Sequence, residues 1–175
     1  MYKEYADFAL DFLKKSKVDY GEVRLEEHEP TGFVLKNGIP ELSGFNNSAG
    51  LGIRFLIKNS LGFVSINNFD NKNIKDNINI AIKNVKRGRK LSENVGLSEE
   101  KVFKRNYKVP QKIKFKDVDA NKQLKLLYET DSNIKNAIGR YLSLSSDVAK
   151  KYFVTTEGAK IVSEIPRASF LYMIT

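Results

Sequence analysis

The fold is decided by residues 51–66, which read LGIRFLIKNSLGFVSI. Apolar side chains occupy every second position from Leu51 to Ile57 and part of the positions between them, which is typical of a strand covered on both faces. Lys58–Gly62 has the polar and glycine residues of a turn, and residues 63–66 form a return strand. This segment therefore predicts two antiparallel strands near the centre of a sheet.

Further strands are predicted on the N-terminal side of this segment. Glu22–Glu26 alternates polar and apolar residues, as a half-buried strand does. Phe33–Lys36 leads into Asn37–Gly38, which we expect to form a two-residue type I′ turn because both residue types tolerate positive φ. The return strand is expected at about Pro40–Phe45. The pattern is that of an antiparallel sheet.

Two amphipathic helices accompany these strands. The first is predicted over Tyr2–Lys15, and the second begins after Asp70, a good N-cap residue, and ends near Arg87–Gly88. Both should pack on one face of the sheet, giving an α+β domain over residues 1–92. We expect one shared core made of Val23, Leu25, Phe33, Leu35, Ile53, Phe55, Phe63, Ile78, Ala81, Ile82 and Val85.

The rest of the chain predicts a connector over 93–111 and the start of a second, smaller α+β lobe over 112–175. This lobe should contain a helix at about Asp119–Asn136, with Ala120, Leu124, Leu127 and Tyr128 as its core stripe. Antiparallel strand-like segments follow at Ile138–Ser145, Lys151–Thr155, Ala159–Glu164 and Arg167–Thr175, with a hairpin turn at Thr156–Gly158. The last segment is apolar to its end, so we expect an incomplete fold with an unpaired edge that favours self-association.

Composition limits the possible functions. The net charge of +9 comes from 23 Lys and 7 Arg against 21 acidic residues. A basic surplus is typical of nucleic-acid binding, but Arg, and not Lys, makes the bidentate contacts favoured for phosphate and guanine. Cysteine is absent, no apolar run approaches the roughly 20 residues of a membrane span, and the N-terminal segment has no signal-peptide pattern. We therefore expect a cytoplasmic protein.

The residues that could carry catalysis do not form a recognisable site. The single histidine, His28, lies in EEHE (26–29), where only Glu26 would share its face of a strand; a solvated strand end is the favoured interpretation. Catalytic zinc needs three protein ligands, and a catalytic triad would need a suitable serine or a cysteine. Gly50–Gly52 precedes a strand and not a helix, which excludes a dinucleotide fingerprint. We predict no catalytic, cofactor-binding or metal-binding residue in this chain.

Two basic stretches leave an alternative open. Residues 83–90 place five cations at a helix end, and residues 101–116 interleave seven cations with Phe103, Tyr107 and Phe115. Cations favour helix C-termini, and charge runs are usually solvated, so a structural interpretation is preferred for both. Phosphate contacts and base stacking are the functional alternative.

Several segments together resemble the TldD/PmbA family. DYGEVR (19–24) is similar to the Asp-Tyr-Ala-Glu-Val-Arg opening of these proteins, and KNG (36–38), GLGIRF (50–55) and LGFVSIN (61–67) follow in the family's order. Tyr152–Ile165 resembles a later hairpin of the family more loosely. The resemblance covers only the family's N-terminal regions.

This resemblance implies a part of a metal-dependent peptidase. Peptidase members have a downstream His-Glu-x-x-x-His motif and a further ligand near the C-terminus, and other members are metal-free partner subunits. Neither ligand position has a counterpart here, so zinc is expected only in full-length peptidase members. We expect this chain to serve in assembly and in enclosing the chamber where a peptide is cut, with itself or a TldD/PmbA-like subunit as partner. The alternatives are a small basic nucleic-acid-binding domain and a truncated product without activity.

Overall fold

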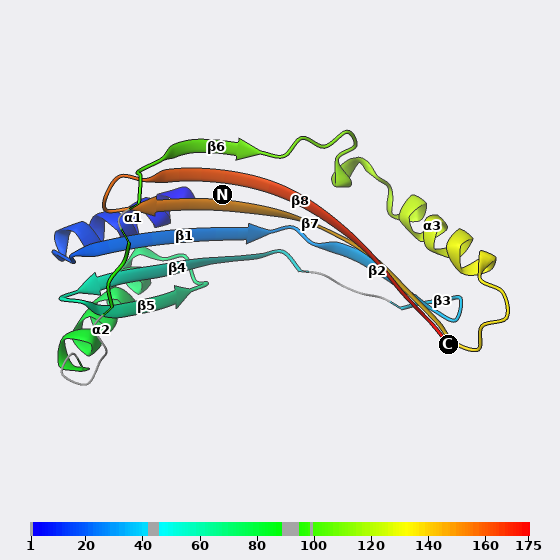
Figure 1. Ribbon diagram of the computed structural model, residues 1–175, viewed down its shortest axis with the longest axis horizontal. Coiled ribbons are helices and arrows are strands. Elements are labelled where there is room, and N and C mark those ends of the chain that lie inside the picture. The colour runs from blue at the N-terminus through cyan, green and yellow to red at the C-terminus, as the bar shows by residue number, and fades with distance from the viewer. Residues whose placement is uncertain (1, 42–45, 89–94, 99) are drawn as a thin grey trace. The chain divides into compact units, whose positions relative to one another are not determined.

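The computed structural model describes residues 2–41, 46–88, 95–98 and 100–175 (Figure 1). It is an α+β fold with antiparallel strands, as the sequence predicts. The elements in chain order are α1 (Lys3–Lys15), β1 (Tyr20–His28), β2 (Thr31–Lys36), β3 (Ile39–Glu41), β4 (Ser48–Ile57), β5 (Ser60–Ile66), α2 (Asn71–Gly88), β6 (Lys104–Lys108), the 3₁₀ turn η2 (Phe115–Asp117), α3 (Ala120–Asn133), β7 (Arg140–Thr155) and β8 (Lys160–Ile174).

The chain divides into two compact units. Unit 1 comprises residues 1–27, 49–107 and 150–163, and unit 2 comprises residues 28–48, 108–149 and 164–175. The long strands β7 and β8 contribute residues to both units. The predicted division into 1–92, 93–111 and 112–175 is a division by chain order and stays a prediction.

Unit 1 is a sheet covered by two helices. Its strands β7, β1, β4 and β5 are neighbours in that order, so β4 is an inner strand, as predicted, and β5 lies at the end (Figure 1). α1 and α2 both contribute to its core, and Asp70 caps α2 by accepting a hydrogen bond from the backbone N–H of Asn73 at 2.8 Å. The largest fully buried side chains of this core are Tyr152, Phe55, Leu13, Leu25, Leu51, Ile53, Ile74 and Ile78.

The predicted core was wrong for the return strand β5. Phe63 is 64% exposed, whereas Val64 and Ile66 are buried. The turn between β4 and β5 consists of two residues, Lys58 and Asn59, both with positive φ, so β5 already begins at Ser60. Because side chains alternate along a strand, this register directs Val64 and Ile66 to the core and Phe63 to the opposite face.

Unit 2 has a smaller core of its own. Leu35, Leu127 and Leu142 are fully buried, with Phe33 packed against them. The prediction that Phe33 and Leu35 share a core with unit 1 was therefore wrong. β2 pairs with β7 and with β3, and positive φ at Asn37 and Gly38 confirms the predicted two-residue turn. The predicted return strand extended to Phe45, but residues 42–45 lie outside the described residues.

Helix α3 buries less than its sequence predicts. Its N-cap is Asp119, as expected, and its side chain accepts a hydrogen bond from the backbone N–H of Asn121. Of the predicted stripe only Leu127 is buried; Leu124 is half-buried, and Ala120 and Tyr128 are exposed. The second buried residue of this helix is Asp131, because Arg140 neutralises it at 2.8 Å.

The C-terminal strands are longer than predicted. The predicted segments Ile138–Ser145, from Arg140 onward, and Lys151–Thr155 belong to one strand, β7. β2 and β1 pair with this strand in succession and supply hydrogen-bond partners to its polar middle. β8 likewise continues through Pro166. The Thr156–Gly158 turn joins them, with Gly158 at φ +100°. The predicted connector contains strand β6, which pairs with β8. Among the described helices, none is long and apolar enough to cross a membrane.

Candidate functional site

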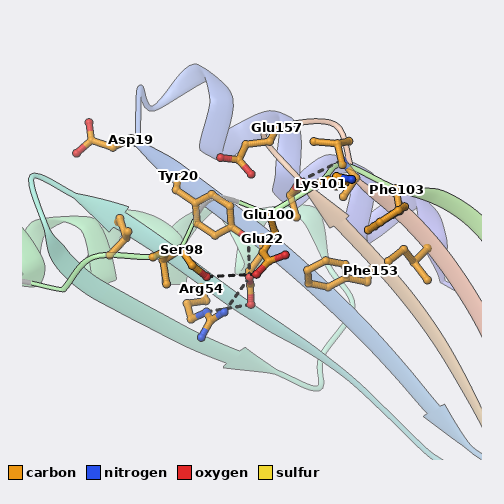
Figure 2. Close-up of a pocket in the computed structure, with 16 residues that line it drawn as sticks. Asp19, Tyr20, Glu22, Arg54, Ser98, Glu100, Lys101, Phe103, Phe153 and Glu157 are labelled. Carbon is orange, nitrogen blue, oxygen red and sulfur yellow. Dashed lines mark hydrogen bonds and ion pairs between the residues drawn. The ribbon is translucent and has the colours of Figure 1, made fainter.

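A cavity of about 490 Å³ lies in unit 1 beside strands β1, β4 and β7 (Figure 2). β1 contributes Tyr20 and Glu22, and β4 contributes Arg54. The remaining walls come from β7, β8, the turn between them and the segment before β6. Since all of these residues belong to unit 1, the cavity is formed within one compact body.

An ion pair is part of the lining of this cavity. Nη2 of Arg54 donates a hydrogen bond of 3.0 Å to Oε2 of Glu22, and Nε of Arg54 lies 2.9 Å from Oε1 of the same carboxylate. The hydroxyl of Tyr20 donates a further hydrogen bond of 2.7 Å to Oε2. Both oxygens of Glu22 are thus engaged, so this carboxylate is suited to positioning Arg54 and Tyr20 and not to acting as a free general base.

Burial differs between the two charged partners. Glu22 is 8% exposed as a residue, whereas the Arg54 side chain is 43% exposed and open to solvent. The hydrogen bond to Glu22 raises the pKa of Arg54 above its ordinary value. Burial, together with the hydrogen bond to Glu22, raises the pKa of Tyr20 well above that of a free phenol. The arrangement therefore keeps a neutral phenol beside a fixed guanidinium–carboxylate pair.

The rest of the cavity lining has mixed chemistry. Phe103 and Phe153 provide aromatic surface, and Glu157, Glu100 and Lys101 provide charges of both signs, as Figure 2 shows. Such a lining can hold a ligand with apolar and polar parts. We therefore treat the cavity as a candidate binding site.

Sequence reasoning missed this cluster. Glu22 and Arg54 stand on polar positions of two strands that the sequence predicts correctly, but their contact depends on how β1 pairs with β4. Tyr20 and Glu22 are two residues apart and therefore share a face of β1, which is a signal that could have been used. The pairing of an Arg with a Glu across strands is not encoded in either segment alone.

The single histidine also has a partner that the sequence did not indicate. In unit 2, Nδ1 of His28 lies 2.7 Å from Oδ2 of Asp147, and both side chains are partly buried. His28 is the last residue of β1, as expected, but its side chain is partly buried and paired instead of fully solvated. Glu26 is bound instead by Lys151 at 3.0 Å, within unit 1. Among the described residues, no group of three or more His, Cys, Asp or Glu residues could hold a metal ion.

The remaining candidate segments lie on helices and strands where they are described. Gly50 and Gly52 lie inside strand β4, in agreement with the rejected dinucleotide fingerprint. Of the basic stretch 83–90, residues up to 88 end helix α2, and 89 and 90 lie outside the described residues. In the stretch 101–116, residues Lys104–Lys108 form strand β6, with Arg105 over the ring of Phe103 at 5.4 Å.

Comparison with known proteins identifies the fold and the family. Residues 21–87 match the model of PmbA/TldA metallopeptidase domain 1. A metalloprotease of Methanocaldococcus jannaschii is 36% identical over 160 residues, which cover 89% of this chain and 35% of the relative. The chain thus spans about a third of the length of that relative.

Solved structures show the same fold at low sequence identity. A protein described as a modulator of a DNA gyrase from Thermotoga maritima superimposes with a TM-score of 0.68 at 14% identity, covering 100% of this chain and 43% of that one. TldE from Thermococcus kodakarensis gives a TM-score of 0.60 at 16% identity, covering 98% of this chain and 42% of that one. With the matched first domain at residues 21–87, the chain belongs to the TldD/PmbA family of metallopeptidase-like proteins.

Proposed function

We propose that this chain is a non-catalytic part of a TldD/PmbA-like metal-dependent peptidase or of its metal-free partner subunit. Its role would be assembly and enclosure of the chamber in which a peptide is cut. Family membership supports this proposal, as does the fact that the chain covers 35% of a metalloprotease relative. The full sequence has one His and no Cys, whereas catalytic zinc needs three protein ligands, so we place zinc and hydrolysis in other parts of the full-length peptidase members.

The observation that carries the proposal is an exposed apolar segment in unit 2. Residues 170–174 of β8, FLYMI, are all apolar or aromatic and each is 42–62% exposed. Because successive side chains of a strand point to opposite faces, both faces of this segment are apolar. Such strands are typical of sheets that are covered on both sides. We propose that the covering layer is another part of a TldD/PmbA-like protein, either from a longer chain or from a partner subunit.

The location and the metal follow from the same proposal. An absence of cysteine is compatible with a reducing compartment, and we propose the cytoplasm. For the chain alone we expect neither stoichiometric zinc after dialysis nor cleavage of a peptide library. One equivalent of tightly held zinc, or cleavage by the isolated chain that a chelator abolishes, would contradict the proposal.

Co-expression tests the assembly role directly. The chain would be expressed together with the part of the Methanocaldococcus jannaschii metalloprotease that the sequence match leaves uncovered. We expect the two polypeptides to co-purify, because the uncovered part supplies a layer for the FLYMI segment. The double substitution Leu171→Lys and Met173→Lys should abolish co-purification, since it places cations on an apolar face. Tyr107→Lys, at an exposed aromatic residue of β6, is the matched control and should have no effect. Equal recovery of all three proteins would refute the role of this segment.

A further inference from the structure

A second surface, in unit 1, is also open to a partner. β5 ends the strand order β7-β1-β4-β5, and no described strand pairs with its outer edge. On the exposed face of β5, Leu61 is 44% and Phe63 is 64% exposed, followed by the exposed Ser65. We call the outer edge of β5 together with these three side chains the β5 edge.

The register of the β4–β5 hairpin fixes which backbone groups the β5 edge presents. Ile57 pairs with Ser60 across a two-residue turn, so this pair is hydrogen-bonded and pairs alternate from there. The hydrogen-bonded residues of β5 are then 60, 62, 64 and 66. Leu61, Phe63 and Ser65 direct their N–H and C=O groups away from β4. The edge thus offers a regular row of donors and acceptors for a further strand.

Two other edge strands of the described fold, β6 and β3, are protected, and β5 is not. β6 reads KRNYK, so its cations discourage pairing, and β3 is three residues long and contains Pro40. β5 reads SLGFVSI, with neither a charge nor a proline in seven residues. An unprotected edge of this length pairs with other strands unless a specific partner covers it.

The groove beside this edge is also uncharged. A groove of about 360 Å³ runs between β5 and α2, and none of its lining residues carries a charge, although the whole chain has a net charge of +9. Residues 61–65 of the strand line the groove, together with Asn77, Ile80, Ala81, Asn84 and Val85 of the helix. The groove is thus centred on Phe63 and lies near Ile80, which is 57% exposed. Two copies of a cationic chain would repel each other less at this surface than at a cationic one.

From this geometry we propose that the β5 edge pairs antiparallel with the β5 edge of a second copy, with the two-fold axis at Phe63. This register opposes Phe63 to its counterpart and Leu61 to Ser65 of the other copy. All three residues have outward backbone groups, so every one of them meets a hydrogen-bonding counterpart. The α2 helices would lie antiparallel beside the axis, with Ile80 near Ile80 and Asp76 of one copy toward Lys83 of the other. The β5 edge is therefore self-complementary in hydrogen bonds and apolar surface, and the neighbouring α2 helices add pairs of opposite charge.

Disulfide trapping tests the register, because the chain contains no cysteine. In the proposed dimer the Cα atoms of opposed hydrogen-bonded residues are about 5.5 Å apart, within the range that a disulfide spans. Phe63→Cys should therefore cross-link to itself under mild oxidation, doubling the 19.9 kDa mass. Leu61→Cys alone should not, since its own counterpart is four residues off register, about 14 Å away. A mixture of Leu61→Cys and Ser65→Cys should cross-link. Cross-linking of Leu61→Cys alone at the same rate as Phe63→Cys, or of none of these, would overturn the proposal.

Sedimentation equilibrium tests the association itself, and its outcome is independent of the proposed assembly role of the FLYMI segment. The wild-type chain should show a concentration-dependent monomer–dimer equilibrium. Phe63→Lys should weaken the dimer by about tenfold or more, because two ammonium groups would meet at the axis. Leu171→Lys, in the FLYMI segment of unit 2, is the control and should leave the dimer unchanged. A strictly monomeric wild type, or a dimer weakened by Leu171→Lys and not by Phe63→Lys, would refute the β5 edge as the interface.

Discussion

The contact between Phe55 and Gly62 gives the strongest test of the unit 1 core. These residues are opposite each other in the β4–β5 ladder, and the Phe55 ring is fully buried. The ring lies directly over Gly62, since a Cβ atom at that position would be 2.8 Å from Cε1 of Phe55 and still nearer to Cζ and Cε2. The glycine therefore provides space for an aromatic ring that has no room to move.

Three variants convert this geometry into measurable free energies of unfolding. Phe55→Ala should cost about 3–5 kcal/mol, the usual range for removing a buried Phe side chain. Gly62→Ala should cost about 1–3 kcal/mol because it overpacks the same place. In the double variant the ring is absent, so the added methyl group meets no clash. In that background we expect Gly62→Ala either to leave the free energy of unfolding unchanged or to raise it by up to about 1 kcal/mol. The gain would come from the lower conformational entropy of the unfolded chain with Ala in place of Gly.

Urea unfolding of the four proteins, analysed by linear extrapolation, measures this coupling. The expected interaction free energy is about 1–4 kcal/mol in favour of the double variant. If Phe55→Ala costs less than about 1 kcal/mol, β4 is not the central strand of the core. If Gly62→Ala costs the same in both backgrounds, the ring does not lie over the glycine. Either result would refute the argument from burial and register.

Three other predictions concern the turn, the ion pair and the phenols. Gly38→Val should destabilise by about 1–3 kcal/mol in urea unfolding, because φ at this position is +79°; an unchanged midpoint would show that the turn relaxes. In the same assay, Arg54→Met should lower the free energy of unfolding more than Glu22→Gln does. Arg54→Met leaves the buried carboxylate of Glu22 without its cation, whereas Glu22→Gln leaves an Arg54 side chain that water can reach. The opposite order would show that Glu22 is hydrated. Burial, and then hydrogen bonds to carboxylates, raise the pKa of Tyr20 and of Tyr152 in the folded state. The two phenols therefore contribute fully to the free energy of unfolding below the pKa of a free phenol, and this contribution should fall as pH rises above about 10. Unfolding free energies that are equal at pH 9 and 11 would contradict this.

Local signals predicted several elements of both units well. The Asn37–Gly38 turn, the Asp70 cap and the α1 helix each depend on residues close together in sequence, and all three are present. The errors begin where local propensity competes with pairing. The polar middle of β7 predicts a break, but β2 and β1 supply hydrogen-bond partners there, and the strand continues.

Register was the second source of error. Phe63 is predicted in the core as part of the apolar phase of a return strand over residues 63–66, but the observed turn has only two residues, Lys58 and Asn59, and β5 begins at Ser60. A strand that shifts by one residue exchanges its two faces, so the core assignment of Phe63 reversed with it. The Glu22–Arg54 pair could not be predicted for a related reason, because it depends on the alignment of two strands whose own sequences do not specify it.

The exposure of Phe63 is more informative than its predicted burial would have been. Large aromatic residues are more often buried, and an edge strand that displays one without a charge or a proline leaves a surface that favours association. The FLYMI segment of β8 has the same property in unit 2, yet its apolar residues are consecutive and cover both faces, whereas those of β5 alternate and leave one face inside the core. The FLYMI segment has two exposed apolar faces, which a covering layer would bury. β5 has one exposed face and an outer edge that no described strand pairs with, and a further strand would satisfy that edge. We therefore propose different partners for the two surfaces: further TldD/PmbA-like structure for β8, and a second copy for β5.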